Sequence, residues 1–153
     1  MLPVRHSDQS QIRKFAREHL AWEMGRFRRG VALWGRRDGE EGAMLRESCL
    51  MHLRLLLDFF YPRGTSKKYP DDVRPEHFVA DGHWDPPEPP WLQGYRDRLD
   101  QLLVHLTYKR LDWAEDQKMV WRPEQQFAHV ELIWGQFLSS LPEDRRRWFS
   151  EPR

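Results

Sequence analysis

Two polar side chains in the second half of the chain are spaced so that both can reach one phosphate group. Arg98 and His105 stand seven residues apart in a segment, 93–111, whose apolar spacing predicts a helix. On an α-helix this spacing leaves them within about 20° around the axis and about 10 Å along it. An imidazole transfers protons near neutral pH, and a guanidinium stabilises charge on phosphate oxygens. The more common alternative is a pair of ordinary surface residues on a charged flank.

His52 is a second candidate, because it lies in the middle of the apolar face of another predicted helix, residues 43–61, beside Ser48 and Cys49. A buried imidazole needs hydrogen-bond partners. We favour a neutral core histidine bonded to a carbonyl or a hydroxyl group. The alternative is a binding residue, either a metal ligand or a general base in a pocket between helices.

Arg110 falls on the same arc as the leucines of the 93–111 helix, which is an unusual position for a cation. An arginine there either extends outward or pairs with a carboxylate, and Asp58 and Glu131 are the expected partners. We favour structural pairing over a binding role.

Trp84 and Trp91 mark a proline-rich segment, residues 62–92, as a candidate surface for binding a partner. Its prolines exclude a long helix, and a connection of this length is typical of a lid, a binding loop or disorder. We expect its aromatic side chains to pack down on the helices. A second segment, Arg145-Arg146-Arg147-Trp148, has side chains suited to nucleic acid, although the acids around it favour a solvated terminus.

Several catalytic and metal-binding motifs are absent from the sequence. It contains no HxxxH, HExxH or paired-cysteine spacing of a zinc site and no GxSxG nucleophile motif. A zinc site needs three or four converging ligands, so we expect neither a metal nor another cofactor.

The apolar pattern predicts an all-α fold with a four-helix bundle core and a long proline-rich loop between helices two and three. The first helix follows an N-cap at Ser7 and carries an apolar stripe from Ile12 to Trp34, with Gly25 and Gly30 reducing its helical propensity. Residues 43–61 form the second and most buried helix, and residues 93–111 form the third. The fourth starts near Pro123 and carries a seam at Phe127, Val130, Trp134, Phe137 and Leu141. We expect a single helical domain over residues 1–153.

The sequence contains 25 Lys and Arg residues and 24 Asp and Glu residues, which gives a net charge of +1. This balance argues against a protein whose whole surface binds phosphate groups. A local basic patch is still compatible with this total. The single cysteine, Cys49, excludes an internal disulfide and fits a reducing compartment. Because the sequence has neither a secretory signal nor an apolar run of about 20 residues, we expect a cytoplasmic protein without a membrane anchor.

Two short segments resemble HEPN-type helical domains of uncharacterised bacterial proteins. Residues 47–54, Glu-Ser-Cys-Leu-Met-His-Leu-Arg, followed by Asp-Phe-Phe at 58–60, are similar to a buried helix of such proteins. Residues 105–110, His-Leu-Thr-Tyr-Lys-Arg, are similar to a later helix. The resemblance covers about residues 43–112.

In this family an arginine followed by a histidine after four to six residues marks a metal-independent ribonuclease site. Arg98 and His105 meet the spacing, as do Arg46 and His52, and we prefer the first pair because its members share a stripe. Leu99 stands where the family usually has a polar residue. The resemblance implies a ribonuclease or an RNA-binding relative, with two such motifs facing each other across a homodimer.

Two other functions fit the sequence. The first is a non-enzymatic interaction or scaffold domain that binds a partner protein through an exposed apolar patch near Trp84 and Trp91. The second and weaker one is a metal-binding bundle resembling the DinB type, with His52 and His105 among its ligands.

Overall fold

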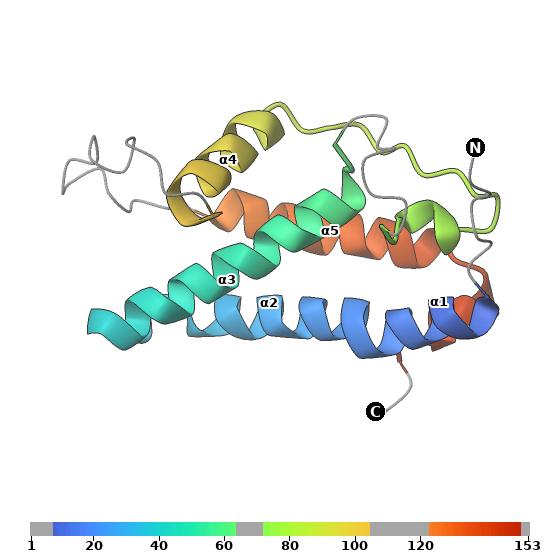
Figure 1. Ribbon diagram of the computed structural model, residues 1–153, viewed down its shortest axis with the longest axis horizontal. Coiled ribbons are helices and arrows are strands. Elements are labelled where there is room, and N and C mark those ends of the chain that lie inside the picture. Colours follow the sequence, from blue (N-terminus) through green and yellow to red (C-terminus); the bar gives the residue numbers. More distant parts are fainter. Residues whose placement is uncertain (1–7, 64–71, 105–122, 151–153) are drawn as a thin grey trace.

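The structure, a computed structural model, describes residues 8–63, 72–104 and 123–150, and these residues are mostly helical. No β-strand occurs among these residues, and the all-α class is confirmed. Figure 1 shows a long rod along one side, crossed by α3, with α4 and α5 beyond it. The elements are α1 (Gln9–Phe15), the π-helical segment η1 (Ala16–Leu20), α2 (Ala21–Leu33), α3 (Gly39–Phe60), the 3₁₀ turn η2 (Pro75–His77), α4 (Leu92–Leu99), the π-helical segment η3 (Asp100–Val104), α5 (Glu124–Ser140) and α6 (Glu143–Arg147).

The rod consists of α1, η1 and α2, which follow one another without a break (Figure 1). Its N-cap is Asp8, whose carboxylate accepts a hydrogen bond from the backbone N–H of Ser10 at 3.1 Å. The cap expected at Ser7 lies outside the described residues. The expected apolar stripe is confirmed as the inner face of the rod, buried at Ile12, Ala16, Leu20, Met24 and Phe27 and packed against the core at Val31 and Trp34.

Gly30 lies where α2 passes close to Cys49 of α3, and it does not interrupt the helix. A Cβ atom at this position would lie 2.7 Å from the Cβ and 2.8 Å from the Sγ of Cys49. Only a residue without a side chain fits such a contact. The glycine that lowers helical propensity therefore permits the crossing of the two helices.

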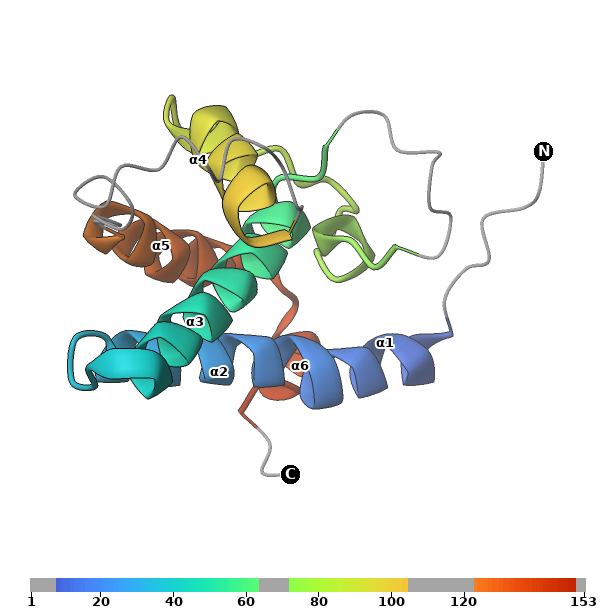
Figure 2. The same cartoon turned by 60° about the vertical axis from the view of Figure 1, so that its left-hand side comes forward.

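α3 is the central helix, since it contacts α2, α4 and α5 (Figure 2). It starts at Gly39, four residues before the expected position 43, and it ends at Phe60. Its buried residues include Leu50, Leu53, Leu57 and Phe60, as expected for the most apolar segment. The helical wheel was wrong about Ser48, which is exposed.

The connection between α3 and α4 packs on the helices through its aromatic residues, which confirms the expectation for Phe78 and Trp84. The Phe78 side chain is fully buried, and Trp84 Nε1 donates a hydrogen bond to the carbonyl oxygen of Phe60 at 2.9 Å. Arg145 of the C-terminal region donates from Nη1 to the carbonyl oxygen of Phe78 at 2.8 Å. Two segments far apart in sequence are thus tied together by one guanidinium group.

α4 is shorter than the helix expected over residues 93–111. α-Helical bonding ends at Leu99, and residues 100–104 continue as the π-helix η3. A π-helix bonds residue i to i+5 and is wound less per residue than an α-helix. The remainder of the expected helix lies outside the described residues.

The C-terminal region agrees with the sequence pattern. All five residues of the expected seam of α5 are buried, and a short helix, α6, follows Pro142. The arginines of α6 bond within the protein: Arg146 donates from Nε to the carbonyl oxygen of Leu138 at 3.0 Å, and Arg147 pairs with Glu143. Trp148 is buried, so this segment is engaged in the fold. None of the described helices is both long enough and apolar enough to cross a lipid bilayer.

Candidate nucleic-acid interface

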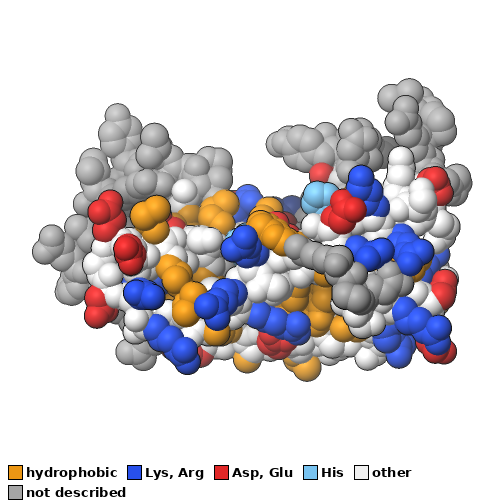
Figure 3. Space-filling view, turned by 90° about the horizontal axis from the view of Figure 1, so that it is seen from below, with side chains coloured by type: hydrophobic (Ala, Val, Ile, Leu, Met, Phe, Trp, Pro, Cys, Tyr) orange, Lys and Arg blue, Asp and Glu red, His pale blue; other side chains and the backbone are white. Residues whose placement is uncertain are grey.

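The outer side of α1, η1 and α2 carries a concentration of Lys and Arg side chains, called the basic face below. Figure 3 views this side of the molecule and shows Lys and Arg spread along it. Between residues 8 and 37 the acidic residues are Asp8, Glu18 and Glu23. The basic residues there are Arg13, Lys14, Arg17, Arg26, Arg28, Arg29, Arg36 and Arg37, all exposed except the half-buried Arg17.

The eight basic residues of this segment outnumber its three acidic residues. Arg28 forms a bidentate ion pair, in which its Nε and Nη2 atoms donate to the two carboxylate oxygens of Glu131, each at 2.8 Å. Lys14 lies 3.9 Å from Glu18 with both side chains largely in solvent, which is a weak interaction. The net charge of +1 for the whole chain conceals this local excess. The first 37 residues are basic and the rest of the chain is acidic, a charge asymmetry along the sequence from which the face is predictable.

At the edge of the basic face, α3 brings His52 against Glu23 of α2. His52 Nδ1 lies 2.5 Å from Glu23 Oε2, and the side chains are 15% and 25% exposed. The Trp22 ring packs edge-on to the imidazole with centroids 5.6 Å apart, and the Arg26 guanidinium lies 4.9 Å from the centre of the Trp22 ring. The expectation that His52 bonds a carbonyl or a hydroxyl is wrong. Its partner is a carboxylate, and the pair is half-buried.

A second polar cluster joins the end of α3 to α4 and η3 around Arg96, whose side chain is 2% exposed. Arg96 Nη2 donates to the carbonyl oxygens of Leu57, at 2.5 Å, and Tyr61, and its Nε lies 3.2 Å from Asp58 Oδ1. Burial lowers the pKa of Arg96, although Asp58 opposes this shift. Sequence reasoning missed this residue, which stands four residues after Leu92 and three before Leu99 on one buried stripe.

Two more arginines complete the cluster around Asp100. Arg54 Nε donates to Asp100 Oδ1 at 2.6 Å, and Arg63 Nη1 donates to Oδ2 at 2.7 Å. Burial acts to raise the pKa of Asp100, but the hydrogen bonds from these arginines outweigh it and hold that pKa below its usual value. Arg54 also pairs with Asp58 one turn later, with Nη1 3.2 Å from Oδ2.

The structure describes only part of the site expected from Arg98 and His105. Arg98 is half-buried near the end of α4, whereas His105 and Arg110 lie outside the described residues. The argument that Arg98 and His105 share a stripe assumed a continuous α-helix, and that assumption is wrong over residues 100–104. The expected partners of Arg110 have other partners: Asp58 pairs with Arg54, Arg63 and Arg96, and Glu131 pairs with Arg28.

Trp84 and Trp91 are half-buried and directed into the fold. The Trp84 ring packs at right angles to Phe137, with centroids 5.7 Å apart, and Trp91 packs edge-on to His129 at 5.2 Å. Among the described residues, the exposed large apolar side chains are Met44, Leu55 and Leu132. The apolar patch expected at the two tryptophans is therefore not formed by their rings.

On a helical wheel His129 falls opposite the seam of α5, a position that would leave it in solvent, but its ring packs against Tyr61 and Trp91. It is half-buried, with Nε2 2.8 Å from the hydroxyl of Tyr61 and the two rings stacked at 5.8 Å. Burial lowers the pKa of His129, which favours the neutral ring. The neutral ring accepts the Tyr61 O–H at Nε2, so the polar atom has a partner inside the fold.

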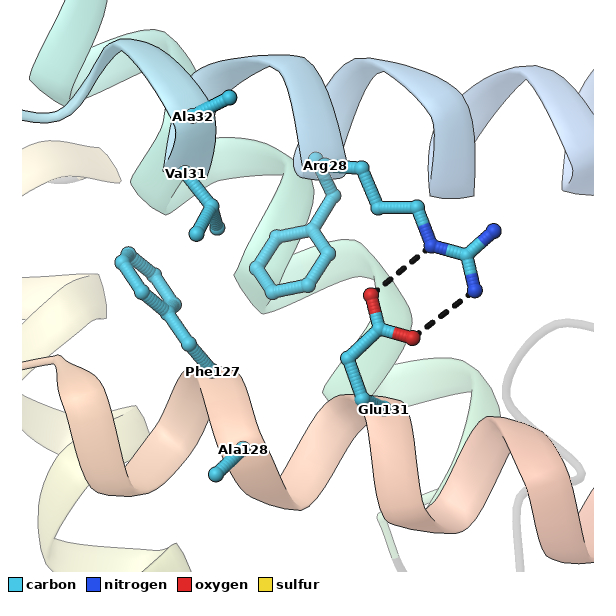
Figure 4. Close-up of a pocket in the computed structure, with 7 residues that line it drawn as sticks. Arg28, Val31, Ala32, Phe127, Ala128 and Glu131 are labelled. Carbon is cyan, nitrogen blue, oxygen red and sulfur yellow. Dashed lines mark hydrogen bonds and ion pairs between the residues drawn. The ribbon is translucent and has the colours of Figure 1, made fainter.

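A groove with a volume of about 350 Å³ separates α2 from α5 (Figure 4). Phe27 and Val31 of α2 and Phe127 of α5 form its apolar lining, with Ala32 and Ala128 at the sides. Figure 4 shows the Arg28–Glu131 ion pair spanning the gap at one end. Within the described residues, no group of three or more His, Cys, Asp or Glu side chains converges to hold a metal ion.

The geometry therefore offers three distinct features, namely a basic face with a histidine–carboxylate pair at its edge, a buried arginine cluster and an apolar groove. The arginine cluster bonds helix-end carbonyls and aspartates of its own fold, which is a structural role. No family model, curated protein or solved structure matches the chain. The basic face and the apolar groove are the two features suited to binding another molecule.

Proposed function

We propose that this chain is a cytoplasmic RNA-binding protein of HEPN-like type that binds single-stranded RNA along the basic face. The proposal includes a four-helix core of α2, α3, α4 with η3, and α5, spanned by the proline-rich loop of residues 62–92. The observation that carries it is the row of exposed Lys and Arg side chains on α1 and α2. A clustered positive surface on one face is the electrostatic footprint of a nucleic-acid site.

Single-stranded RNA is favoured over a duplex by Trp22 and Arg26. A guanidinium on an indole ring, 4.9 Å from its centre here, presents a flat cationic surface on which an unpaired base can stack. Phosphate charges along the strand would meet side chains such as Lys14 and Arg29, both exposed. Every base offers a π-face, so such a site tolerates different sequences.

The HEPN resemblance extends the proposal to cleavage by Arg98 and His105 in a homodimer. Arg98 would neutralise phosphate oxygens, and His105 would transfer a proton at the ribose 2′-hydroxyl or at the leaving oxygen. This part rests on the resemblance and on the spacing of the two residues.

RNA binding is tested by fluorescence anisotropy with a labelled single-stranded RNA over a series of salt concentrations. We expect binding that weakens steeply with salt, with a logarithmic slope of about −0.7 for each phosphate contacted. The double variant Lys14→Ala/Arg29→Ala removes two positive charges from the basic face. It should bind at least about 10-fold more weakly and show a shallower slope.

The matched control is Arg146→Ala/Arg147→Ala, which removes two charges from α6 but none from the basic face. Its affinity should stay within about threefold of the unchanged chain, since distant exposed charges are largely screened. Equal weakening of RNA binding in both double variants would mean that binding depends on the net charge of the chain and not on the basic face. A lack of salt-dependent binding would contradict the proposal outright.

The groove between α2 and α5 favours a second function, a protein-interaction domain. The groove is apolar inside, with the cation Arg28 on its α2 side and the acid Glu131 on its α5 side. An amphipathic helix with an acidic flank toward α2 and a basic flank toward α5 matches these charges. Calorimetry with such a synthetic helix should show binding that Ala32→Arg abolishes, whereas binding unaffected by Ala32→Arg would exclude the groove.

A further inference from the structure

We propose that the solvent-facing side of α3 docks an antiparallel helix of a partner protein, whose apolar stripe is flanked by Lys and Arg residues. The docking surface, called the α3 stripe below, consists of Met44, Ser48, Met51 and Leu55. It shares no residue with the basic face or with the groove between α2 and α5. The inference therefore does not depend on RNA binding or on the groove.

The first observation is that the outward-facing line of α3 is apolar. Its residues follow one another at spacings of four, three and four, so they lie on one side of the helix. Met44 and Leu55, at the two ends, are 65% and 43% exposed. Leu132 of α5 is the remaining exposed large apolar side chain among the described residues. Two of these three side chains thus share one line of one helix.

The α3 stripe has the dimensions of a surface that binds a helix. Met44 and Leu55 stand eleven residues apart, which is three turns and about 16 Å along the axis. An amphipathic partner helix presents apolar residues at i, i+4 and i+7, and three turns match that repeat. Two of the residues are methionines, whose unbranched thioether side chains adapt to the shape of a partner.

The second observation is the charge around Met44, which selects the kind of partner. Glu40 and Glu41 precede Met44 by four and three residues and Glu47 follows it by three, so all three acids are its neighbours on the helix surface. All three are exposed, and none forms an ion pair with a described residue. These carboxylates repel RNA and anionic lipids, whereas Lys and Arg residues of a partner would pair with them.

The position of the acids also sets the direction of the partner helix. Glu40 and Glu41 lie in the first turn of α3, so the basic residues of the partner have to lie over that end. Cations are favourable near the C-terminal end of a helix because of its dipole. A helix with Lys and Arg in its last turns is therefore stabilised by its own dipole and runs antiparallel to α3 when it docks.

The test uses a synthetic peptide, stapled into a helix of about 16 residues, because unstapled peptides of this length are only marginally helical. Its leucines repeat the spacings of the α3 stripe, and lysines flank them in its last turns. Fluorescence anisotropy of the labelled peptide with the full chain should show saturable binding. We expect a Kd on the order of 10–100 μM, since one helix on another is a small interface.

Met44→Ser/Leu55→Ser removes the apolar ends of the α3 stripe and should weaken peptide binding by at least about 10-fold. The matched control is Leu132→Ser, which changes a leucine of α5 that is 59% exposed. The control should stay within about threefold of the unchanged chain. Circular dichroism should be the same for all three proteins, since the replaced side chains are exposed. Equal weakening in both variants would overturn the inference.

Glu41→Lys/Glu47→Lys tests the role of charge. It should weaken binding of the lysine peptide by about 10-fold and strengthen binding of a peptide with glutamates in place of the lysines. Glu124→Lys/Asp144→Lys makes the same change in net charge at exposed acids of α5 and α6 and should leave both affinities within about threefold. A peptide with its lysines moved to the first turns should bind more weakly, and equal binding would overturn the antiparallel assignment.

The remaining outcomes separate the α3 stripe from the other two surfaces. Peptide binding that is lost in Ala32→Arg but kept in Met44→Ser/Leu55→Ser would place the peptide in the groove and overturn the inference. No saturable binding up to about 1 mM peptide would overturn it as well. RNA binding by Met44→Ser/Leu55→Ser should stay within about threefold of the unchanged chain, so the failure of one proposal is distinguishable from the failure of the other.

Discussion

Arg96 is a buried cation, and hydrogen-bond acceptors surround its guanidinium group. Its guanidinium donates to two carbonyl oxygens at the C-terminal end of α3 and lies 3.2 Å from Asp58. The last carbonyls of a helix carry its negative dipole end, so a cation there is favourable. The Leu57 carbonyl also accepts the backbone N–H of Tyr61, at 3.0 Å. Desolvation opposes this gain, and the cluster is stable only while every member is present.

Replacing Arg96 by Met should lower the free energy of unfolding by about 3 kcal/mol, because Asp58 and the carbonyls of Leu57 and Tyr61 would each lose one buried partner. Urea denaturation of both proteins measures the difference. Asp97→Ala is the control, since this neighbouring carboxylate is exposed and accepts a hydrogen bond from Gln93, its only side-chain partner among the described residues. It should change the value by less than about 0.5 kcal/mol. If the free energy of unfolding falls no more in Arg96→Met than in Asp97→Ala, the arginine cluster does not contribute to stability.

His129 should make stability sensitive to mild acid. Its pKa is lower in the folded chain than the ordinary value of about 6.5, because burial disfavours the charged ring. The unfolded chain therefore binds the proton more tightly, and stability is full above pH 6.5 and declines as the pH falls through the folded value. His77 is shifted in the same direction, also by burial, and adds to the decline.

The measurement compares unfolding free energies at pH 7.5 and pH 5.5 in the unchanged chain and in His129→Gln. A glutamine keeps an acceptor for the Tyr61 hydroxyl but does not titrate. We expect a smaller loss on acidification in the variant. An identical loss would mean that His129 does not contribute to the acid sensitivity.

At the scale of elements, the crossing of α2 over α3 depends on Gly30, which has no side chain. Gly30→Ala should lower the free energy of unfolding by about 1–3 kcal/mol, because the new Cβ would lie 2.7 Å from Cys49 Cβ and the helices would have to separate. Gly25→Ala, in the same helix with no atom within 4 Å of the new Cβ, should instead raise it by about 0.5–1 kcal/mol. Thermal unfolding of the pair checks both signs, and equal signs would contradict the packing argument.

Most elements were predictable from the sequence because their burial repeats at helical spacing. The stripe from Ile12 to Trp34 and the seam of α5 need only the period of an α-helix, and both are confirmed. The π-helical segments were not predictable in this way, since they depend on bonding from i to i+5 and leave no distinct residue pattern. The misplacement of Ser48 and His129 has another cause, because a wheel describes one helix and ignores which neighbours cover its flanks.

The candidate site was less predictable than the fold. His52 was singled out from its position on an apolar face, but its partner Glu23 comes from another helix, 29 residues earlier in the chain. No rule of spacing within one helix joins two such residues. The basic face, in contrast, can be recognised in the sequence from the many arginines before position 38. The net charge of the whole chain does not reveal it, because acidic residues elsewhere compensate for these arginines.

At the scale of the whole molecule, the thiol of Cys49 reports on the opening of the helix pair. Its side chain is 1% exposed, and burial raises its pKa to about 12. A thiol reagent such as Ellman's reagent should therefore react with the native protein orders of magnitude more slowly than with free cysteine at pH 8. The rate should rise with urea and in Gly30→Ala. Labelling within seconds without denaturant would show that α2 and α3 separate readily.

The aromatic packing between α3 and α5 has a consequence for synthesis on the ribosome. Phe60 meets Trp134 and Phe137, which are translated long after it. At about 5–20 residues per second, Phe137 is added roughly 4–15 s after Phe60. During that interval the nascent α3 presents an uncovered aromatic surface, the kind of surface that chaperones bind. Completion of this fold is therefore a late event in translation, set by the arrival of α5.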